Sequence, residues 1–228
     1  MTFSIVARCA RTGQLGVGAV TGTPGVGQLV TWAEAGVGAV ATQAWVNPYL
    51  GVDGLDLMGN GHPAERTLRA VVAMDDDRRL RQVGMVDAHG TSAAYTGERC
   101  ERWAGHRSEQ DVAVQGNLLE GPETLDACLE AYAGSPGSDL VDRLIGALIA
   151  GEKAGGDRRG ARSASVLVVA TERYPLWDLR IDDSDRPLEA LTDLRDDIAE
   201  TLLPQILRLP TRQDSQGGLH ADDHAGLV

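Results

Sequence analysis

The N-terminal segment sets the pattern of the chain. From residue 2 to residue 9, hydroxyl and apolar side chains alternate, so that Thr2 and Ser4 share one face and Phe3 and Ile5 the other. A period of two residues predicts a β-strand. A turn at residues 11–14 then leads to an apolar segment at residues 15–21, which is the natural partner of the first strand in a hairpin.

The rest of the pattern alternates groups of strands with pairs of helices. Apolar positions at helical spacing predict helices, and alternating or continuously apolar segments predict strands. Two short helices are expected between residues 51 and 74, the second with Pro63 in its first turn. Further helices are predicted at residues 122–133, 139–153 and 187–209, and further strands at residues 36–43, 82–87, 91–95, 111–115, 163–170 and 176–182.

This order of elements indicates an α+β fold. Strands that arrive in hairpin-compatible groups favour antiparallel sheets, and the helix pairs must cover the faces of those sheets. A four-layer sandwich with helices outside two sheets satisfies both conditions, and a three-layer α+β sandwich is the alternative. With 228 residues, the chain can bury one large core, so a single domain is expected at residues 1–210. Residues 211–228 lack periodicity and are expected to form a disordered tail.

Composition narrows the range of partners. The formal net charge of −12 disfavours nucleic acid and anionic membranes, which select for basic surfaces, and favours a small-molecule substrate or a protein partner. The three cysteines and five histidines show no metal-site spacing, so neither a metal nor another cofactor is expected. No signal peptide or long apolar segment is apparent, which predicts a cytoplasmic protein with reduced thiols.

Thr2 is the first candidate for chemistry. Removal of Met1, which a small second residue permits, would place a hydroxyl and a free α-amine on the same residue. An α-amine with a pKa of roughly 7.7–8 can accept the hydroxyl proton near neutral pH. Many proteins begin in the same way, however, and the alternative interpretation is that Thr2 is an ordinary residue of an edge strand.

Two other positions offer groups that acyl transfer requires. Gly116 and Asn117 follow a predicted strand and are either donors to an oxyanion or an ordinary turn. Asp157 and Arg159 lie in a glycine-framed loop before a core strand. They either polarise and position the nucleophile, or clamp a substrate carboxylate, or form a structural ion pair that stiffens the loop.

The tryptophans are candidates for a binding pocket. With only one phenylalanine in the chain, tryptophans either line a small-molecule site or belong to the core. Ser4 shares a face with Thr2 and is better placed to support the α-amine than to attack. The candidates for substrate binding are Ser4, Arg8, Trp32, Gln43, Trp45, Asn47, Trp103 and Gly116.

Several short segments stand in an order that is itself informative. They are Thr2–Arg8, Trp32–Ala44, Tyr95–Gly97, Trp103–His106, Gln115–Asn117 and Ala154–Gly160. This ordered set resembles DUF1028, a bacterial and archaeal family of unknown function placed in the N-terminal nucleophile (Ntn) hydrolase superfamily. The resemblance extends over about residues 2–183, which is most of the chain.

The resemblance implies an αββα sandwich in which the first strand presents Thr2 in a cleft between the sheets. It also implies an enzyme that uses the Thr2 hydroxyl as nucleophile and the α-amine of Thr2 as base. The expected reaction is hydrolysis of a C–N bond in a small amide, carbamate or acyl-amino compound through an acyl-enzyme. Because Ntn folds often oligomerise, a homo-oligomer is a possible assembly.

The chain departs from the family pattern after Val20. Residues 21–24 read Thr-Gly-Thr-Pro, whereas members of the family commonly carry Ser followed by Lys or Arg. A cation there would keep the amine neutral and stabilise developing negative charge. Without it, Arg8 or Arg159 would have to supply the charge. The alternative function is therefore a catalytically silent protein that binds a small metabolite on the same fold.

Overall fold

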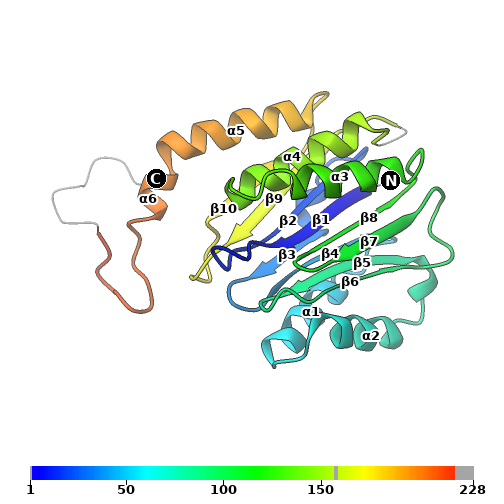
Figure 1. Cartoon of the computed structure of the whole chain (residues 1–228), viewed down its shortest axis with the longest axis horizontal. Helices are drawn as coiled ribbons and strands as arrows, with labels where there is room; N and C mark the ends of the chain where they lie inside the picture. The colour runs from blue at the N-terminus through cyan, green and yellow to red at the C-terminus, as the bar shows by residue number, and fades with distance from the viewer. Residues whose placement is uncertain (1, 157–158, 219–228) are drawn as a thin grey trace.

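The computed structural model describes residues 2–156 and 159–218, which form a mixed α+β fold with two antiparallel sheets (Figure 1). The larger sheet has the strand order β10-β9-β2-β1-β8-β7, and the smaller sheet has the order β3-β4-β5-β6. The strands are β1 (Thr2–Arg8), β2 (Leu15–Thr21), β3 (Thr31–Glu34), β4 (Gly38–Ala44), β5 (Arg81–Asp87), β6 (Ser92–Thr96), β7 (Gly105–Glu109), β8 (Val112–Asn117), β9 (Ser163–Val169) and β10 (Trp177–Ile181).

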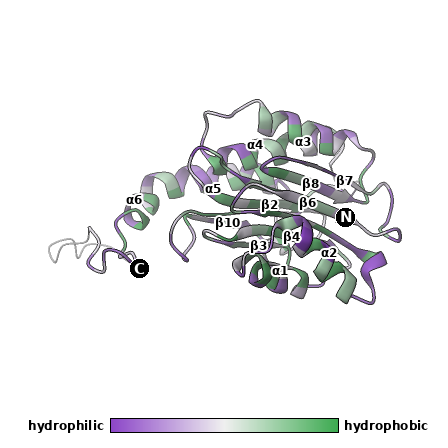
Figure 2. Cartoon of the chain, turned by 60° about the horizontal axis from the view of Figure 1, so that its bottom comes forward, coloured by the Kyte–Doolittle hydropathy of each residue, from purple (hydrophilic) through white to green (hydrophobic). Residues whose placement is uncertain are grey.

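Helices lie on the outer face of each sheet (Figures 1 and 2). Helices α3, α4 and α5 pack on the six-stranded sheet, and α1 and α2 pack on the four-stranded sheet. The helices are α1 (Tyr49–Gly59), α2 (Ala64–Met74), α3 (Glu123–Ala133), α4 (Leu140–Lys153), α5 (Pro187–Thr201) and α6 (Leu203–Ile206), with short 3-10 turns at Val26–Gln28 and Arg78–Leu80. No helix among the described residues is long and apolar enough to cross a membrane.

The alternation of β1 places its two faces in different parts of the core. Phe3 and Ile5 are completely buried against α3 and α4, whereas Val6 is buried between the two sheets. Small residues keep the sheets close together. An added Cβ at Gly84 on β5 would lie 1.9 Å from Oε1 of Gln115 on β8, so the two sheets contact each other directly at this point.

The predicted α+β class, the antiparallel sheets and most of the predicted elements are confirmed. Two strands escaped prediction, β3 and β7, because both are short and carry no buried residue. The last helix was expected to run through residues 187–209, but α5 ends at Thr201 and α6 begins at Leu203. Pro204 in the first turn of α6 explains the interruption, since proline has no amide hydrogen to continue the helical ladder.

The structure describes the first part of the predicted disordered tail, up to residue 218. Residues 212–218 form bends and turns, in which Thr211 and Asp214 exchange hydrogen bonds. Residues 219–228 lie outside the described part of the chain, so the disordered tail remains a prediction.

Candidate functional site

Thr2 begins a central strand of the six-stranded sheet. Thr21 on β2 lies opposite it on one side and Asn117 on β8 on the other. Because β1 pairs on both sides, it is a central strand rather than an edge strand. Thr2 is half-buried while Phe3 is completely buried, so Thr2 is the point at which β1 reaches the surface.

The Thr2 hydroxyl belongs to a row of hydroxyl groups at this end of the sheet. Thr2 Oγ1 donates to Thr21 Oγ1 over 3.1 Å, and Thr21 Oγ1 lies 3.3 Å from Thr23 Oγ1. Ser163, the first residue of β9, donates from Oγ to the main-chain oxygen of Thr23 over 2.6 Å. The orientation of the Thr2 side chain is therefore set by neighbouring hydroxyls.

The main-chain oxygen of Thr2 is held from both sheets. Gln43 on β4 donates to it from Nε2 over 3.1 Å, and Asn117 donates from Nδ2 over 3.5 Å. Both amides also donate to Oε1 of Gln82, over 2.8 Å from Gln43 and 2.9 Å from Asn117. Asn117 is the last residue of β8, so it is a strand residue rather than a turn residue, and its side chain is committed to positioning Thr2.

These contacts belong to a buried hydrogen-bond network between the sheets that contains no charged side chain among its members. We call Ser4, Gln43, Gln82, Gln115 and Asn117 the amide network. Ser4 Oγ donates to Gln43 Oε1 and accepts from Gln115 Nε2, each over 2.6 Å. All five residues are at least 96% buried, and such groups are costly to bury without partners. The network therefore fixes the register and separation of the two sheets beneath Thr2.

The amide network also extends outward to a cavity. Gln82 Nε2 donates to Thr96 Oγ1 over 2.9 Å, and Thr96 Oγ1 lies 2.9 Å from Nδ1 of His106. His106 lines a cavity of about 360 Å³ formed by the connection between β6 and β7, which we call the His106 cavity. Burial lowers the pKa of His106 below its ordinary value, and the positive charge of Arg107 lowers it further.

The loop between β4 and α1 presents an exposed tryptophan. Trp45 is 68% exposed, and its main-chain oxygen accepts from Arg81 Nη1 over 2.8 Å. Arg81 Nε donates to Asp75 Oδ2 over 2.9 Å, and Asn47 Nδ2 donates to the same oxygen over 2.7 Å. Burial raises the pKa of Asp75, but hydrogen bonds from Arg81 and Asn47 outweigh it and lower the pKa below its usual value. Asn47 therefore braces the loop.

Two of the expected binding residues lie away from Thr2. Arg8 is at the opposite end of β1, where it forms an ion pair with Asp111 at 2.9 Å and lines a separate cavity of about 410 Å³. Trp32 packs on the outer face of the four-stranded sheet, where an added Cβ at Gly51 of α1 would lie 2.6 Å from its ring. The structure therefore brings neither Arg8 nor Trp32 to the candidate site.

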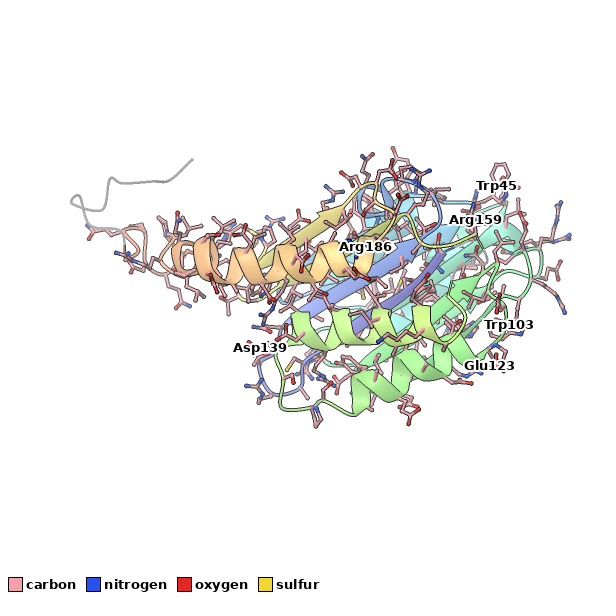
Figure 3. All side chains as sticks on the ribbon, turned by 90° about the horizontal axis from the view of Figure 1, so that it is seen from above. Trp45, Trp103, Glu123, Asp139, Arg159 and Arg186 are labelled. Carbon is pink, nitrogen blue, oxygen red and sulfur yellow. The ribbon has the colours of Figure 1, made fainter. Side chains whose placement is uncertain are left out.

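The remaining candidates lie at the Thr2 end or outside the described residues. Arg159 lies at the same end of the molecule as Trp45 and Trp103 (Figure 3). Gly116 precedes Asn117 in β8, and an added Cβ there would lie 2.6 Å from Leu119, so close packing requires glycine. Asp157 lies outside the described residues. Within the part of the chain that the structure describes, no group of three or more His, Cys, Asp or Glu residues is placed to hold a metal ion.

Sequence reasoning missed several members of this site. Gln82, Gln115, Thr96 and His106 were not candidates, although all connect to Thr2 through hydrogen bonds. The available signal was an uncharged amide within an otherwise apolar strand, as in the segment Ala113–Asn117. Such a side chain faces the interior and therefore requires a buried partner.

Comparison with known proteins gives a family, and a solved structure of that family is similar to this chain over its whole length. Residues 2–191 match the model described as "Family of unknown function (DUF1028)". A solved DUF1028 protein from Silicibacter pomeroyi is 31% identical, with a TM-score of 0.89 over 100% of this chain and 99% of that chain.

Two more distant structures share little sequence. Anbu (ancestral beta-subunit) from Yersinia bercovieri is 12% identical, with a TM-score of 0.42 over 91% of this chain and 98% of its own. An Anbu mutant from Hyphomicrobium sp. strain MC1 is 11% identical, with a TM-score of 0.40 over 92% of this chain and 100% of its own. No curated protein matches the sequence.

Proposed function

The chain belongs to the DUF1028 family, and from this premise we propose that it is an Ntn-type hydrolase cleaving the C–N bond of a small amide, carbamate or acyl-amino compound. We infer that the two sheets and their outer helices form the four-layer αββα sandwich of that superfamily. The expected substrate is a small molecule and the expected compartment is the cytoplasm. Because Ntn folds often oligomerise, the proposed assembly is a homo-oligomer.

The position of Thr2 carries the proposal. Thr2 is the first residue of a central strand, its hydroxyl donates to Thr21 Oγ1, and Gln43 holds its main-chain oxygen from the opposite sheet. The backbone of Thr2 is thereby fixed on three sides while the residue stays partly exposed. A nucleophile held in this way needs little reorganisation to reach a bound carbonyl group.

The chemistry requires that the mature chain begin at Thr2. The α-amine then accepts the hydroxyl proton as Thr2 Oγ1 attacks the substrate carbonyl carbon. The C–N bond breaks, the proton passes to the leaving nitrogen, and an ester remains on Thr2. Water hydrolyses this ester to release the acid and restore the hydroxyl. Arg159 is the candidate cation at this end of the molecule, while Arg8 lies at the other end of β1.

Three threonine variants test the proposal against a panel of small amides and carbamates, with amine release as the assay. Thr2→Ala should lower turnover by at least about a thousandfold, because it removes the nucleophile. Thr2→Ser should keep measurable turnover. Thr12→Ala, in the exposed turn at the other end of β1, is the matched control and should keep full activity. Full turnover by Thr2→Ala would exclude the mechanism, and a ligand bound but recovered unchanged would favour a binding protein.

A further inference from the structure

The His106 cavity lies beside the residues that follow Asn117. Trp103 exchanges two main-chain hydrogen bonds with Leu119, at 3.2 and 3.0 Å, and Leu118 N donates to the main-chain oxygen of Glu101 over 2.9 Å. These bonds attach the connection between β6 and β7 to the end of β8. The cavity wall is therefore positioned by backbone contacts with the strand that pairs with Thr2.

The lining of the cavity includes the indole of Trp103 and the imidazole of His106. An added Cβ at Gly105 would lie 2.5 Å from Cη2 of Trp103, so the indole ring lies directly against the backbone of Gly105. Thr96 Oγ1 accepts a hydrogen bond from Gln82 Nε2 and lies 2.9 Å from Nδ1 of His106. When the Thr96 hydroxyl donates to Nδ1, the imidazole is neutral and Nε2 carries the N–H.

Three polar groups that line the cavity have no hydrogen-bond or ion-pair partner among the residues that the structure describes. Among the described residues, nothing binds Nε1 of Trp103, Nε2 of His106 or the guanidinium of Arg102, and both ring nitrogens remain accessible. The other charged groups of the lining are already paired, since Glu98 binds Arg79 at 3.2 Å and Arg107 binds Asp126 at 3.0 Å.

The unpartnered groups of the cavity thus comprise N–H donors and one net positive charge. A carboxylate accepts hydrogen bonds from such donors, and a guanidinium binds it in a planar, two-pronged geometry. The indole of Trp103 in the lining offers an aromatic neighbour for a planar group attached to that carboxylate. In a chain with a formal net charge of −12, an unpaired arginine beside two free ring donors is a specific feature of this cavity.

We propose that the His106 cavity binds the carboxylate of a small planar organic acid through Arg102, Trp103 and His106. Resting on the proposed function, we further assign this carboxylate to the substrate cleaved at Thr2, so that the substrate class is an amide or carbamate that also bears a carboxylate. Gly105 lies opposite Gly116, which lies opposite Phe3. Two strand spacings put Gly105, which lines the cavity, roughly 10 Å from Phe3 near the start of β1. We infer that one substrate molecule spans this separation.

Benzoate and benzamide, which have similar shape but different charge, are suitable probes for the full-length protein. The readout is the NMR signals of the His106 imidazole and the Trp103 indole N–H. Benzoate should shift both signals saturably, and benzamide should shift neither at the same concentration. Equal shifts with the two probes, no shift with benzoate, or tighter binding of inorganic phosphate than of benzoate would overturn the carboxylate assignment.

Two arginine variants locate the charge that is responsible. Arg102→Gln should weaken benzoate binding about tenfold or more, since it removes a charge-assisted hydrogen bond. Arg99→Gln changes an exposed arginine of the same connection that does not line the cavity, and benzoate affinity should stay unchanged. Equal affinity of Arg102→Gln and the native protein would contradict the proposal.

The binding assay is independent of turnover, so the two proposals fail separately. Benzoate binding together with full activity of Thr2→Ala would remove the hydrolase mechanism and leave the carboxylate site. Loss of turnover in Thr2→Ala without benzoate binding to the native protein would remove the carboxylate site and leave the mechanism.

Discussion

Gln43 Nε2 on β4 donates to the main-chain oxygen of Thr2 on β1 over 3.1 Å, which ties the first residue of the six-stranded sheet to the four-stranded sheet. Gln43 is completely buried and also accepts from Ser4 Oγ. The position of the candidate nucleophile therefore depends on the distance between the sheets. Residues that set this distance should influence both stability and the proposed activity.

Gln43→Leu tests this dependence. The substitution removes the shorter of the two side-chain hydrogen bonds to Thr2 O, leaving the one from Asn117, and it deprives Ser4 Oγ of its acceptor. A buried polar group without its partner costs about 1–3 kcal/mol, so we expect a loss of about 3 kcal/mol in the free energy of unfolding by urea. Gln28→Leu, at an exposed glutamine, should change stability by less than about 0.5 kcal/mol. Similar losses in the free energy of unfolding for the two variants would show that the amide network contributes little to stability.

Gly84→Ala tests the close approach of the sheets. Its Cβ would lie 1.9 Å from Oε1 of Gln115, so Gln115 must move away from Ser4 or the sheets must separate. Overpacking of this kind costs about 1–3 kcal/mol. Gly146→Ala in α4 meets nothing within 4 Å and should instead stabilise the protein by up to about 1 kcal/mol.

A double variant separates the clash at Gly84 from other effects. Gln115→Ala removes the atoms that the new methyl group would meet, at the expense of the bond to Ser4. The Gly84→Ala/Gln115→Ala protein should therefore be less destabilised than the sum of the two single variants. If the losses in stability of the two single variants simply add in the double variant, the clash with Gln115 is not the cause of the Gly84→Ala effect.

Arg81→Met tests whether Arg81 stabilises the loop that carries Trp45. The side chains of Arg81 and Asp75 are only 14% and 6% exposed, so the substitution leaves a buried carboxylate without its charged partner. Breaking a buried pair on one side costs about 3–5 kcal/mol. Arg79→Met breaks an exposed pair with Glu98 and should cost at most about 1 kcal/mol. Thermal unfolding of the two variants is the measurement, and comparable losses would contradict the role of Arg81.

The lowered pKa of His106 predicts that stability depends on pH, with a defined sign. Its pKa is lowered by burial and then by Arg107, with Arg102 and Glu98 also lining the cavity that it faces. The unfolded chain therefore binds a proton more readily, and stability contributed by neutral His106 is lost as the pH falls below about 6.5. An NMR titration of the imidazole should give a midpoint below 6.5, and a midpoint above that value would be inconsistent with this environment.

The pH dependence of unfolding gives a second, independent measure of the protonation of His106. Unfolding by urea between pH 8 and pH 5 should show a component in the native protein that His106→Gln lacks. The two proteins should run parallel above about pH 7, where His106 is neutral in both the folded and the unfolded state. If the native protein instead gained stability relative to His106→Gln as the pH fell from 7 to 5, the sign would be wrong for a lowered pKa.

The sequence predicts the helices and strands of this chain better than it predicts the residues of the candidate functional site. The alternation at residues 2–9 and the apolar spacing of residues 139–153 predict β1 and α4 because burial on one face imposes a period. By contrast, β7 carries Gly-His-Arg-Ser-Glu and shows no such period, because it is a partly exposed edge strand.

The candidate site depends on contacts between distant strands. Gln43, Gln82 and Gln115 meet only because the two sheets stack in one register, which local patterns do not encode. Arg8 illustrates the converse, since it is close to Thr2 in sequence but lies at the other end of a seven-residue strand. Thr2 is a candidate on chemical grounds alone, because a hydroxyl and a free α-amine could lie on the same residue.

The most direct test of the central claim is peptide mapping by mass spectrometry after brief treatment of the protein, purified from its own host, with an activated ester. The account predicts an N-terminal peptide that begins at Thr2 and carries one acyl group, removable by hydroxylamine as an ester on the hydroxyl requires. Thr2→Ala should carry no such adduct. A peptide that still begins at Met1, or a protein that turns over an amide without acylation at Thr2, would contradict the account.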